Sequence, residues 1–165
     1  MRQLVEKYYF FTLLIQRKAF NLNNMIKKIY IAGPLFNVHE KKYLEEIAGV
    51  LEGNGYDCFL PHRDQTGIDP EELKNNEMSQ STKDIIFQTD VQALNESDLV
   101  VALVTGQDID SGTASEIGYM YANNKPVIAL TAEERRYRNL FTAGMFSSTV
   151  QNIGDLLEEI NKIDS

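Results

Sequence analysis

"LVVALV", residues Leu99–Val104, is the stretch that decides the fold. No polar residue interrupts this run, so both of its faces must be buried, as in a central strand of a parallel sheet. The segment "SGTASEIGYMYANN" at 111–124 follows after a short link and predicts a helix. A buried strand followed closely by a helix is typical of a βαβ unit.

The same alternation of strand and helix continues on both sides of this unit. Further strands are expected at 27–33, 56–61, 125–130 and 148–152, and further helices at 39–55, 79–98 and 153–163. Helix 79–98 is expected to turn Ile85, Ile86, Val91 and Leu94 toward the core. The pattern predicts a three-layer α/β fold, flavodoxin-like or Rossmann-like, with helices on both faces of a five-stranded parallel sheet.

The composition limits the size and the partners of this fold. The chain has 165 residues, 43% of them apolar and 24% charged, which suits one globular domain. Its formal net charge of -8 argues against a nucleic acid polymer as partner, since phosphates require a basic face. Its single cysteine, Cys58, is predicted to be a core residue of a strand, and it fits a reducing, cytoplasmic compartment.

The first 24 residues are treated separately from the rest of the chain. Their apolar run "YYFFTLLI" is eight residues long, too short to cross a bilayer, and no cleavage site of a secretory signal is evident. "MIKKIYIAGP", from Met25, resembles a natural protein start. We therefore expect an extension outside the core at 1–24, a folded domain at 25–165, and no membrane contact. The alternative for 1–24 is an amphipathic helix that docks on the domain or on a partner subunit.

Ligands of parallel α/β sheets bind beyond the carboxyl ends of the strands. The loops expected at that edge are 32–37, 61–67, 105–111 and 131–144. The helices also meet this edge, so Asp90 and Glu116 both have a route into one crevice. Two carboxylates close together in a cleft are what the cleavage of a glycosidic bond uses.

Each candidate side chain also has an ordinary structural explanation. Glu116 and Asp90 are equally compatible with solvated helix charges, and Asp110 is most simply the N-cap of the following helix. Tyr30 lies inside the first strand, where a tyrosine is more often a core residue than a catalytic one. Phe36 lies in a glycine-proline loop with no evident core beside it, so packing and stacking on a planar ligand are both open.

Other kinds of site lack their sequence patterns. The loop "IAGP" at 31–34 does not have the glycine spacing of a phosphate-binding loop. No Ser-His-Asp or Cys-His set and no metal-ligand spacing is evident, and His62 and Arg63 are expected in a solvated loop at 62–78. We therefore predict chemistry by carboxylates and a tyrosine, with no metal and no cofactor.

Four pieces of the chain together resemble one enzyme family. They are "IYIAGPLF" at the first strand, "TDVQALNESDLVVALV" before and along the third, "DSGTASEIGY" after it, and "RNL" near the end. In this order and spacing they resemble the nucleoside 2-deoxyribosyltransferases, over roughly residues 27–160. The order and the spacing carry the resemblance more than any single piece does.

The resemblance implies a role for each candidate residue. Glu116 matches the catalytic nucleophile, and Tyr30 matches the tyrosine that hydrogen-bonds and orients it. Asp90 matches the carboxylate near the leaving base. Asp110 matches the residue that holds the sugar 5′-hydroxyl, a role that ranks above its N-cap role once the resemblance is considered, and Phe36 matches a ring that packs on the base.

The resemblance also implies three further substrate-binding positions. Gln65 matches a glutamine that contacts the base, and Gly33 lies in the matching loop after the first strand. Asn139 resembles an asparagine that a neighbouring subunit donates. The resemblance thus implies a homo-oligomer with shared sites, which acts on deoxynucleosides and free nucleobases.

The reaction implied is transfer of deoxyribose between purine and pyrimidine bases through a covalent glutamyl-deoxyribosyl intermediate. Similar enzymes hydrolyse deoxynucleoside 5′-monophosphates and carry a serine where Asp110 stands. A carboxylate at that position repels a phosphate and so favours free nucleosides. The residues leave open whether a base or water accepts the sugar. A sensor module that binds nucleosides or nucleotides without turnover is the alternative from another class.

Overall fold

The computed structural model describes residues 25–69, 71–72, 78–104, 109–131 and 139–164. Five parallel strands form one sheet in the order β2-β1-β3-β4-β5. They are β1 Lys28–Ala32, β2 Asp57–Phe59, β3 Leu99–Leu103, β4 Val127–Leu130 and β5 Ser148–Val150. This is the strand order of flavodoxin-like folds, and it confirms the predicted fold class.

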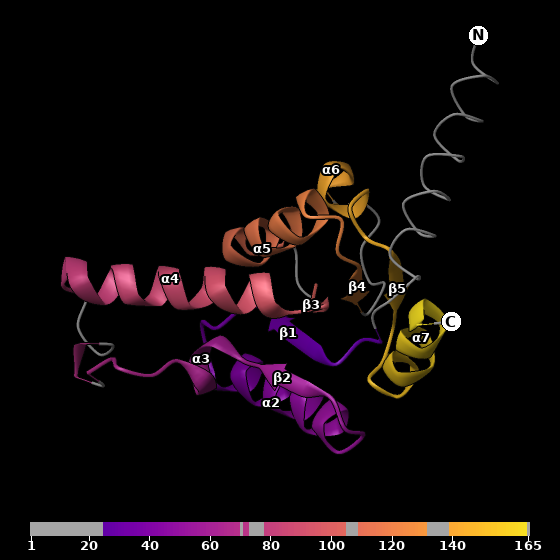
Figure 1. Ribbon diagram of the computed structural model, residues 1–165, viewed down its shortest axis with the longest axis horizontal. Helices are drawn as coiled ribbons and strands as arrows, with labels where there is room; N and C mark the ends of the chain where they lie inside the picture. The colour runs from indigo at the N-terminus through magenta and orange to yellow at the C-terminus, as the bar shows by residue number, and fades with distance from the viewer. Residues whose placement is uncertain (1–24, 70, 73–77, 105–108, 132–138, 165) are drawn as a thin grey trace, which may run out of the picture.

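Helices cover both faces of the sheet (Figure 1). They are α2 Val38–Glu52, α3 Pro61–Asp64, α4 Gln80–Glu96, α5 Ser111–Ala122, α6 Leu140–Ala143 and α7 Gly154–Asp164. Helices α2 and α7 pack with one face of the sheet, and α4 and α5 pack with the other. All residues of β3 are buried, as its uninterrupted apolar run predicted.

Side chains of β1 alternate between the two cores. Ile29 and Ile31 join the core under α2 and α7, whereas Tyr30 and Ala32 join the core under α4 and α5. The alternation therefore places the Tyr30 side chain on the same side of the sheet as α5. Cys58 is buried in the first of these cores, as predicted.

The chain leaves β1 through a close packing contact at Gly33. A Cβ atom there would lie 2.6 Å from Cδ2 of Leu44 and 3.1 Å from Cβ of Leu103, so a larger residue would push the turn away from the core. Helix α2 then begins with a capping box, in which Asn37 accepts the backbone N–H of Glu40 and Glu40 accepts the backbone N–H of Asn37. These two features fix the course of the loop after β1.

Helix α4 does not bury all of the predicted apolar face. Leu94 is buried, but Ile85 is 40% exposed and Phe87 is 62% exposed. Figure 1 shows the reason, because the first half of α4 extends beyond the sheet and has no strand beneath it. The prediction was therefore wrong for Ile85, since helical spacing indicates a common face but not the length of the surface that covers it.

Two of the predicted loops contain short helices. Helix α3 begins at Pro61, inside what was expected to be an irregular segment after the second strand, and α6 lies within the loop expected at 131–144. Residues 1–24 lie outside the described residues, so the predicted extension stays a prediction. Within the described ranges, no helix has both the length and the apolar character needed to cross a bilayer. The cytoplasmic location stays a prediction as well.

Candidate active site

The candidate site lies at the carboxyl edge of the sheet, between β1 and β3. The connections that follow these neighbouring strands lead to α2 on one face and to α5 on the other. Such a reversal leaves a crevice beyond the strand ends, where ligands of open α/β sheets bind. Tyr30 on β1 and Glu116 on α5 both belong to this region.

Glu116 lies on the inner side of α5. Thr113, Ile117 and Met120 are buried on that helix, and Glu116 comes three residues after Thr113 and one before Ile117. This spacing puts its side chain on the stripe that faces the sheet, where it is only partly exposed. Its position on this inner stripe disfavours a merely solvated helix charge.

Tyr30 binds this carboxylate directly. Its hydroxyl donates a hydrogen bond to Oε1 of Glu116 at 2.5 Å, while its ring is fully buried and stacks on Phe59 with 5.5 Å between ring centroids. Burial raises the pKa of the Tyr30 phenol, and the nearby charges of Glu116 and Asp90 raise it further. The hydroxyl therefore stays protonated and remains a donor. Tyr30 is therefore a core residue and a hydrogen-bond partner of Glu116 at the same time.

The surroundings of Glu116 raise the pKa of its carboxyl group. Burial is the largest cause and, with the negative charges of Asp90 and Asp110, raises the pKa of Glu116 to about 7. The hydrogen bond from Tyr30 acts in the opposite direction, because it stabilises the ionised form. Glu116 thus changes its charge near neutral pH.

Replacing Tyr30 with phenylalanine is expected to move the pH dependence of the reaction. A carboxylate must be ionised to act as a nucleophile, so the nucleophile role predicted for Glu116 implies that kcat/KM rises with pH through its pKa of about 7. Tyr30→Phe removes the bond that lowers this pKa, so the acid limb should shift to higher pH, with the greatest loss below neutrality. A uniform loss at every pH, with an unchanged limb, would show that the bond does not control ionisation.

The same raised pKa predicts a cost in stability. The folded state holds the proton of Glu116 more tightly than the unfolded state, so stability falls as the pH rises from 4.5 to about 7. Glu116→Gln removes the buried charge and should stabilise the fold above that range by roughly 1–3 kcal/mol, a few degrees in Tm. Thermal unfolding at both ends of the range checks this, and an equal gain at low pH would contradict it.

Asp90 on α4 pairs with Gln65. The amide Nε2 of Gln65 donates to Oδ1 of Asp90 at 2.8 Å. Burial raises the pKa of Asp90, and the bond from Gln65 opposes this rise. The negative charge of Asp90 raises the pKa of both Glu116 and Tyr30, so Asp90 lies within electrostatic range of both residues.

Asp110 is the N-cap of α5. Its Oδ2 accepts the backbone N–H and the hydroxyl of Thr113, each at 2.9 Å. The N-cap role is therefore present in the structure, and the predicted contact of Asp110 with the sugar stays a prediction. Both capping bonds use Oδ2, so they leave Oδ1 for another partner.

The loop after β1 contributes Gly33 and Phe36. Phe36 is 77% exposed, and its backbone N–H is held by the carboxylate of Glu40 at 2.9 Å. Its ring is therefore available for stacking rather than buried in a core. Gly33 has a packing explanation in its contacts with Leu44 and Leu103, and its predicted substrate contact stays a prediction.

Asn139 is not joined to the other candidates by any hydrogen bond among the described residues. It is exposed and caps α6, where its Oδ1 accepts the backbone N–H groups of Phe141 and Thr142 at 3.1 and 3.2 Å. The structure thus brings together Glu116, Tyr30, Asp90 and Gln65, and leaves Asn139 at the surface.

The contacts of Arg63 are not evident from the sequence. This residue and His62 were expected in a solvated loop, but both lie in α3, where Arg63 binds Glu52 and Asp64 and His62 binds Glu45. The partners on α2 are distant in sequence, so no local pattern could identify them. Over the parts of the chain that the structure describes, no group of three or more His, Cys, Asp or Glu residues is placed to hold a metal ion.

Comparison with known proteins identifies the family. The sequence model of the nucleoside 2-deoxyribosyltransferases matches residues 29–160. The chain belongs to this family. Its resemblance to the family in the sequence is thereby confirmed.

Two similar proteins match most of this chain. A protein of Thermofilum pendens, whose name proposes a 2′-deoxynucleoside 5′-phosphate N-hydrolase, is 30% identical over 84% of this chain and 93% of its own length. A conserved protein of Enterococcus faecalis has a similar structure, with a TM-score of 0.69 and 31% identity over 83% of this chain and 98% of that one.

A further solved structure supports the fold of this family member. A 2-deoxyribosyltransferase of Bacillus psychrosaccharolyticus matches with a TM-score of 0.67 and 24% identity, over 78% of this chain and 89% of that one. Family membership and fold are therefore shown, while the reaction of this chain depends on the site itself.

Proposed function

We propose that this chain is a nucleoside 2-deoxyribosyltransferase, which moves 2-deoxyribose between purine and pyrimidine bases. The observation that carries the proposal is the hydrogen bond from Tyr30 to Glu116, beside the Asp90–Gln65 pair, at the ligand edge of the sheet. Glu116 is a partly buried carboxylate held by the neutral Tyr30 hydroxyl, and such a group is suited to attack on a carbon that becomes positively charged. A site that only binds nucleosides has no need of such a carboxylate.

In the first step Glu116 attacks C1′ of a deoxynucleoside. Tyr30 occupies Oε1, so Oε2 is the oxygen that forms the new bond. The C1′–N bond breaks, its electron pair goes to the base, and an oxocarbenium-like transition state leads to a covalent deoxyribosyl-enzyme. An incoming base then attacks C1′ and releases Glu116, so the configuration at C1′ is retained.

Asp90 supplies and recovers the proton. Its raised pKa suits a carboxylic acid that donates to the departing base in the first step and accepts a proton from the incoming base in the second. In the free protein Glu116 also holds a proton near neutrality. Positive charge developing at C1′ favours the ionised form of Glu116, which leaves Asp90 as the proton donor.

The remaining candidates fit the two ends of the nucleoside. Oδ1 of Asp110 is free of the capping bonds and suits the hydroxyl at C5′ of the sugar. The exposed ring of Phe36 suits stacking on the base. In this proposal the sugar is held at both ends while C1′ lies at Glu116.

Hydrolysis of deoxynucleoside 5′-monophosphates is the second candidate, and the Thermofilum pendens relative favours it. The chemistry at Glu116 is the same, but water replaces the incoming base. The negative charge of Asp110 disfavours a phosphate at that end, which is why we rank transfer first.

A product assay distinguishes the candidates. The protein is incubated with deoxyadenosine or deoxyinosine, with and without cytosine, and with the corresponding 5′-monophosphates, and products are separated by chromatography. Deoxycytidine that forms only when cytosine is present supports transfer. Free deoxyribose, or its phosphate, without a new nucleoside indicates hydrolysis. Binding without any product would leave only the sensor module.

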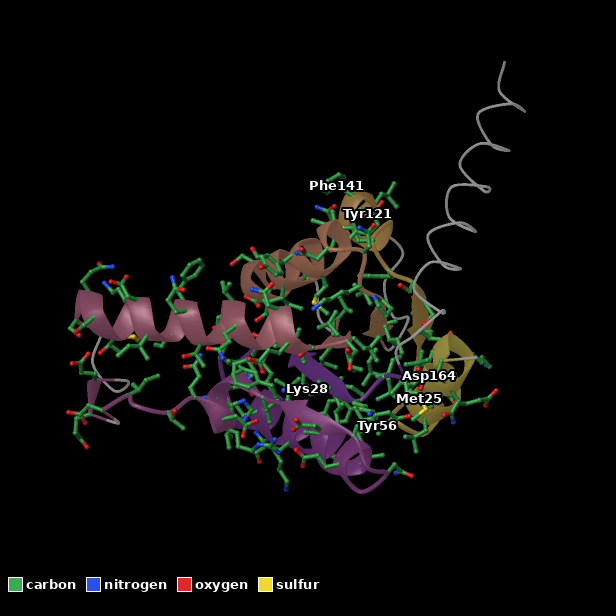
Figure 2. All side chains as sticks on the ribbon, viewed as in Figure 1. Met25, Lys28, Tyr56, Tyr121, Phe141 and Asp164 are labelled. Atoms are coloured by element: carbon green, nitrogen blue, oxygen red, sulfur yellow. The ribbon has the colours of Figure 1, made fainter. Side chains whose placement is uncertain are left out.

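We also propose that the active unit is a homo-oligomer in which Asn139 contributes to a neighbouring subunit's site. Support comes from the apolar surface beside it, where Leu140 is 84% exposed and Phe141 is 79% exposed. Tyr121, labelled with Phe141 in Figure 2, is 50% exposed at the same end of the molecule. Exposed large side chains at this density are typical of a protein interface.

Replacing Asn139 with aspartate is expected to inactivate the protein without unfolding α6. Aspartate keeps an oxygen that caps the helix but loses the amide donor. Mixing Asn139→Asp and Glu116→Ala subunits under conditions of exchange should restore part of the activity, because some sites then receive both intact residues. Full activity of Asn139→Asp alone, or no recovery on mixing, would contradict a shared site.

A further inference from the structure

Helix α3 carries Gln65 but is too short to hold itself. It has four residues, and Gln65 is its C-cap in an extended conformation. A single helical turn is unstable alone, because one turn fixes several backbone angles for few hydrogen bonds. The position of Gln65 therefore depends on what anchors α3.

Arg63 is the principal anchor. Its guanidinium donates to both oxygens of Asp64 at 2.7 and 2.9 Å and to both oxygens of Glu52 at 3.3 and 2.6 Å. It also donates to the backbone oxygen of Cys58 at 3.1 Å. One side chain thus joins α3 to α2 and to β2, with a planar fork that lysine cannot reproduce.

The bonds of the neighbouring residues complete this anchor. Asp64, held by Arg63, accepts the backbone N–H of Leu60 at 2.7 Å and so closes the start of α3. His62 Nε2 lies 3.1 Å from Oε1 of Glu45 on α2. These contacts join α3 to β2 and α2, and none of them is made with a residue of α4.

A groove separates this anchor from α4. It has a volume of about 490 Å³, and Phe59, Arg63 and Asp64 line one side while Thr89, Gln92 and Ala93 line the other. The bond from Gln65 to Asp90 therefore joins α3 to α4, which are separated along this groove. A displacement of α3 would carry Gln65 away from Asp90.

The bond from Gln65 has a consequence for Asp90. An amide N–H only donates, so Oδ1 of Asp90 serves as its acceptor. The proton of neutral Asp90 then belongs on Oδ2. Gln65 in this way selects the oxygen that can give a proton to the leaving base.

We propose that Arg63 is a positioning residue for leaving-group protonation: it locks α3 against α2 and β2, so that Gln65 holds Asp90 with its proton on the oxygen directed at the base. This inference rests on the proposed cleavage of deoxynucleosides. It assigns Arg63 no contact with substrate.

Two nucleosides that differ in their need for a proton test this role. The base of 2′-deoxyinosine leaves well only when protonated, whereas 7-methyl-2′-deoxyguanosine already carries a positive charge and releases a neutral base. Arg63→Met should lower kcat/KM for 2′-deoxyinosine by about tenfold or more and for the methylated nucleoside by less than about threefold. A general loss of structure would lower both alike.

Matched variants keep the test decisive. Gln65→Leu should show the same selective loss, and the double variant Arg63→Met/Gln65→Leu should lose no more than Gln65→Leu, because both act through one bond. Arg63→Lys keeps the charge and should lose less, which covers the case of an unstable Arg63→Met. Lys28→Met is the control, because Lys28, labelled in Figure 2, lines the same groove but pairs with Glu96 of α4.

The outcomes separate the two proposals. Equal losses on both nucleosides in folded Arg63 variants, no loss on either, or additive effects in the double variant would overturn the positioning role while the proposed function stands. A wild-type protein that cleaves neither nucleoside would overturn the proposed function and this inference with it.

Discussion

Glu116→Ala is expected to lower kcat by about 10⁴-fold or more, because it removes the oxygen that bonds to C1′ in the proposed mechanism. Glu116 is the carboxylate that Tyr30 holds, and Asp90 keeps its own partner Gln65. The neighbouring acid therefore remains in place in the variant but has no nucleophile to assist. Initial rates with deoxyinosine and cytosine measure the loss.

Two variants control this prediction. Glu116→Gln keeps the shape and an acceptor for the Tyr30 hydroxyl, and it should be as inactive as Glu116→Ala because an amide is a poor nucleophile. Glu46→Ala removes an exposed carboxylate of α2 and should change little. A Glu116→Ala protein that keeps a tenth or more of its activity would show that another group attacks C1′.

Asp110→Ser is expected to change the preferred substrate from nucleosides to 5′-monophosphates. At a separation of 4 Å and an effective dielectric constant near 20, two like charges repel by about 4 kcal/mol, so the carboxylate should strongly exclude a phosphate. Serine removes the charge and still caps α5. The ratio of kcat/KM for deoxyadenosine 5′-monophosphate to that for deoxyadenosine should rise by about 100-fold or more.

Asp110→Asn is the matched control, because it keeps the shape and the cap but not the charge. It should also gain relative activity on the monophosphate, although less than serine if the serine hydroxyl donates to the phosphate. A wild-type protein that already prefers the monophosphate would contradict this role of Asp110. It would favour the hydrolase that the name of the Thermofilum pendens relative proposes.

Most of the fold could be predicted from short-range patterns. The apolar run at Leu99–Val104 predicted a central strand, and every residue of β3 is buried there. The exposure of Ile85 and the presence of α3 could not be predicted in this way. Both features depend on where neighbouring elements end and on contacts with residues remote in sequence. The spacing of apolar residues along the chain contains no information about either.

The candidate site was predicted less evenly than the fold. The alternation of strands and helices was enough to predict that Glu116 and Asp90 lie at one edge of the sheet. The hydrogen bond from Tyr30 to Glu116 depends in addition on which face of β1 the tyrosine occupies. The anchor at Arg63 depends on Glu52, which lies on another helix. Local motifs therefore provided the candidates Glu116 and Asp90, whereas the contacts that position them required the folded chain.

Mass spectrometry of the acid-quenched protein can detect a covalent deoxyribosyl intermediate on Glu116. The protein is mixed with deoxyinosine in the absence of an acceptor base, quenched rapidly, and digested. One added deoxyribosyl group is expected on the peptide that contains Glu116, and it should disappear when cytosine is added before the quench. Turnover without any such adduct, or an adduct on a different residue in wild type and in Glu116→Gln alike, would contradict this intermediate.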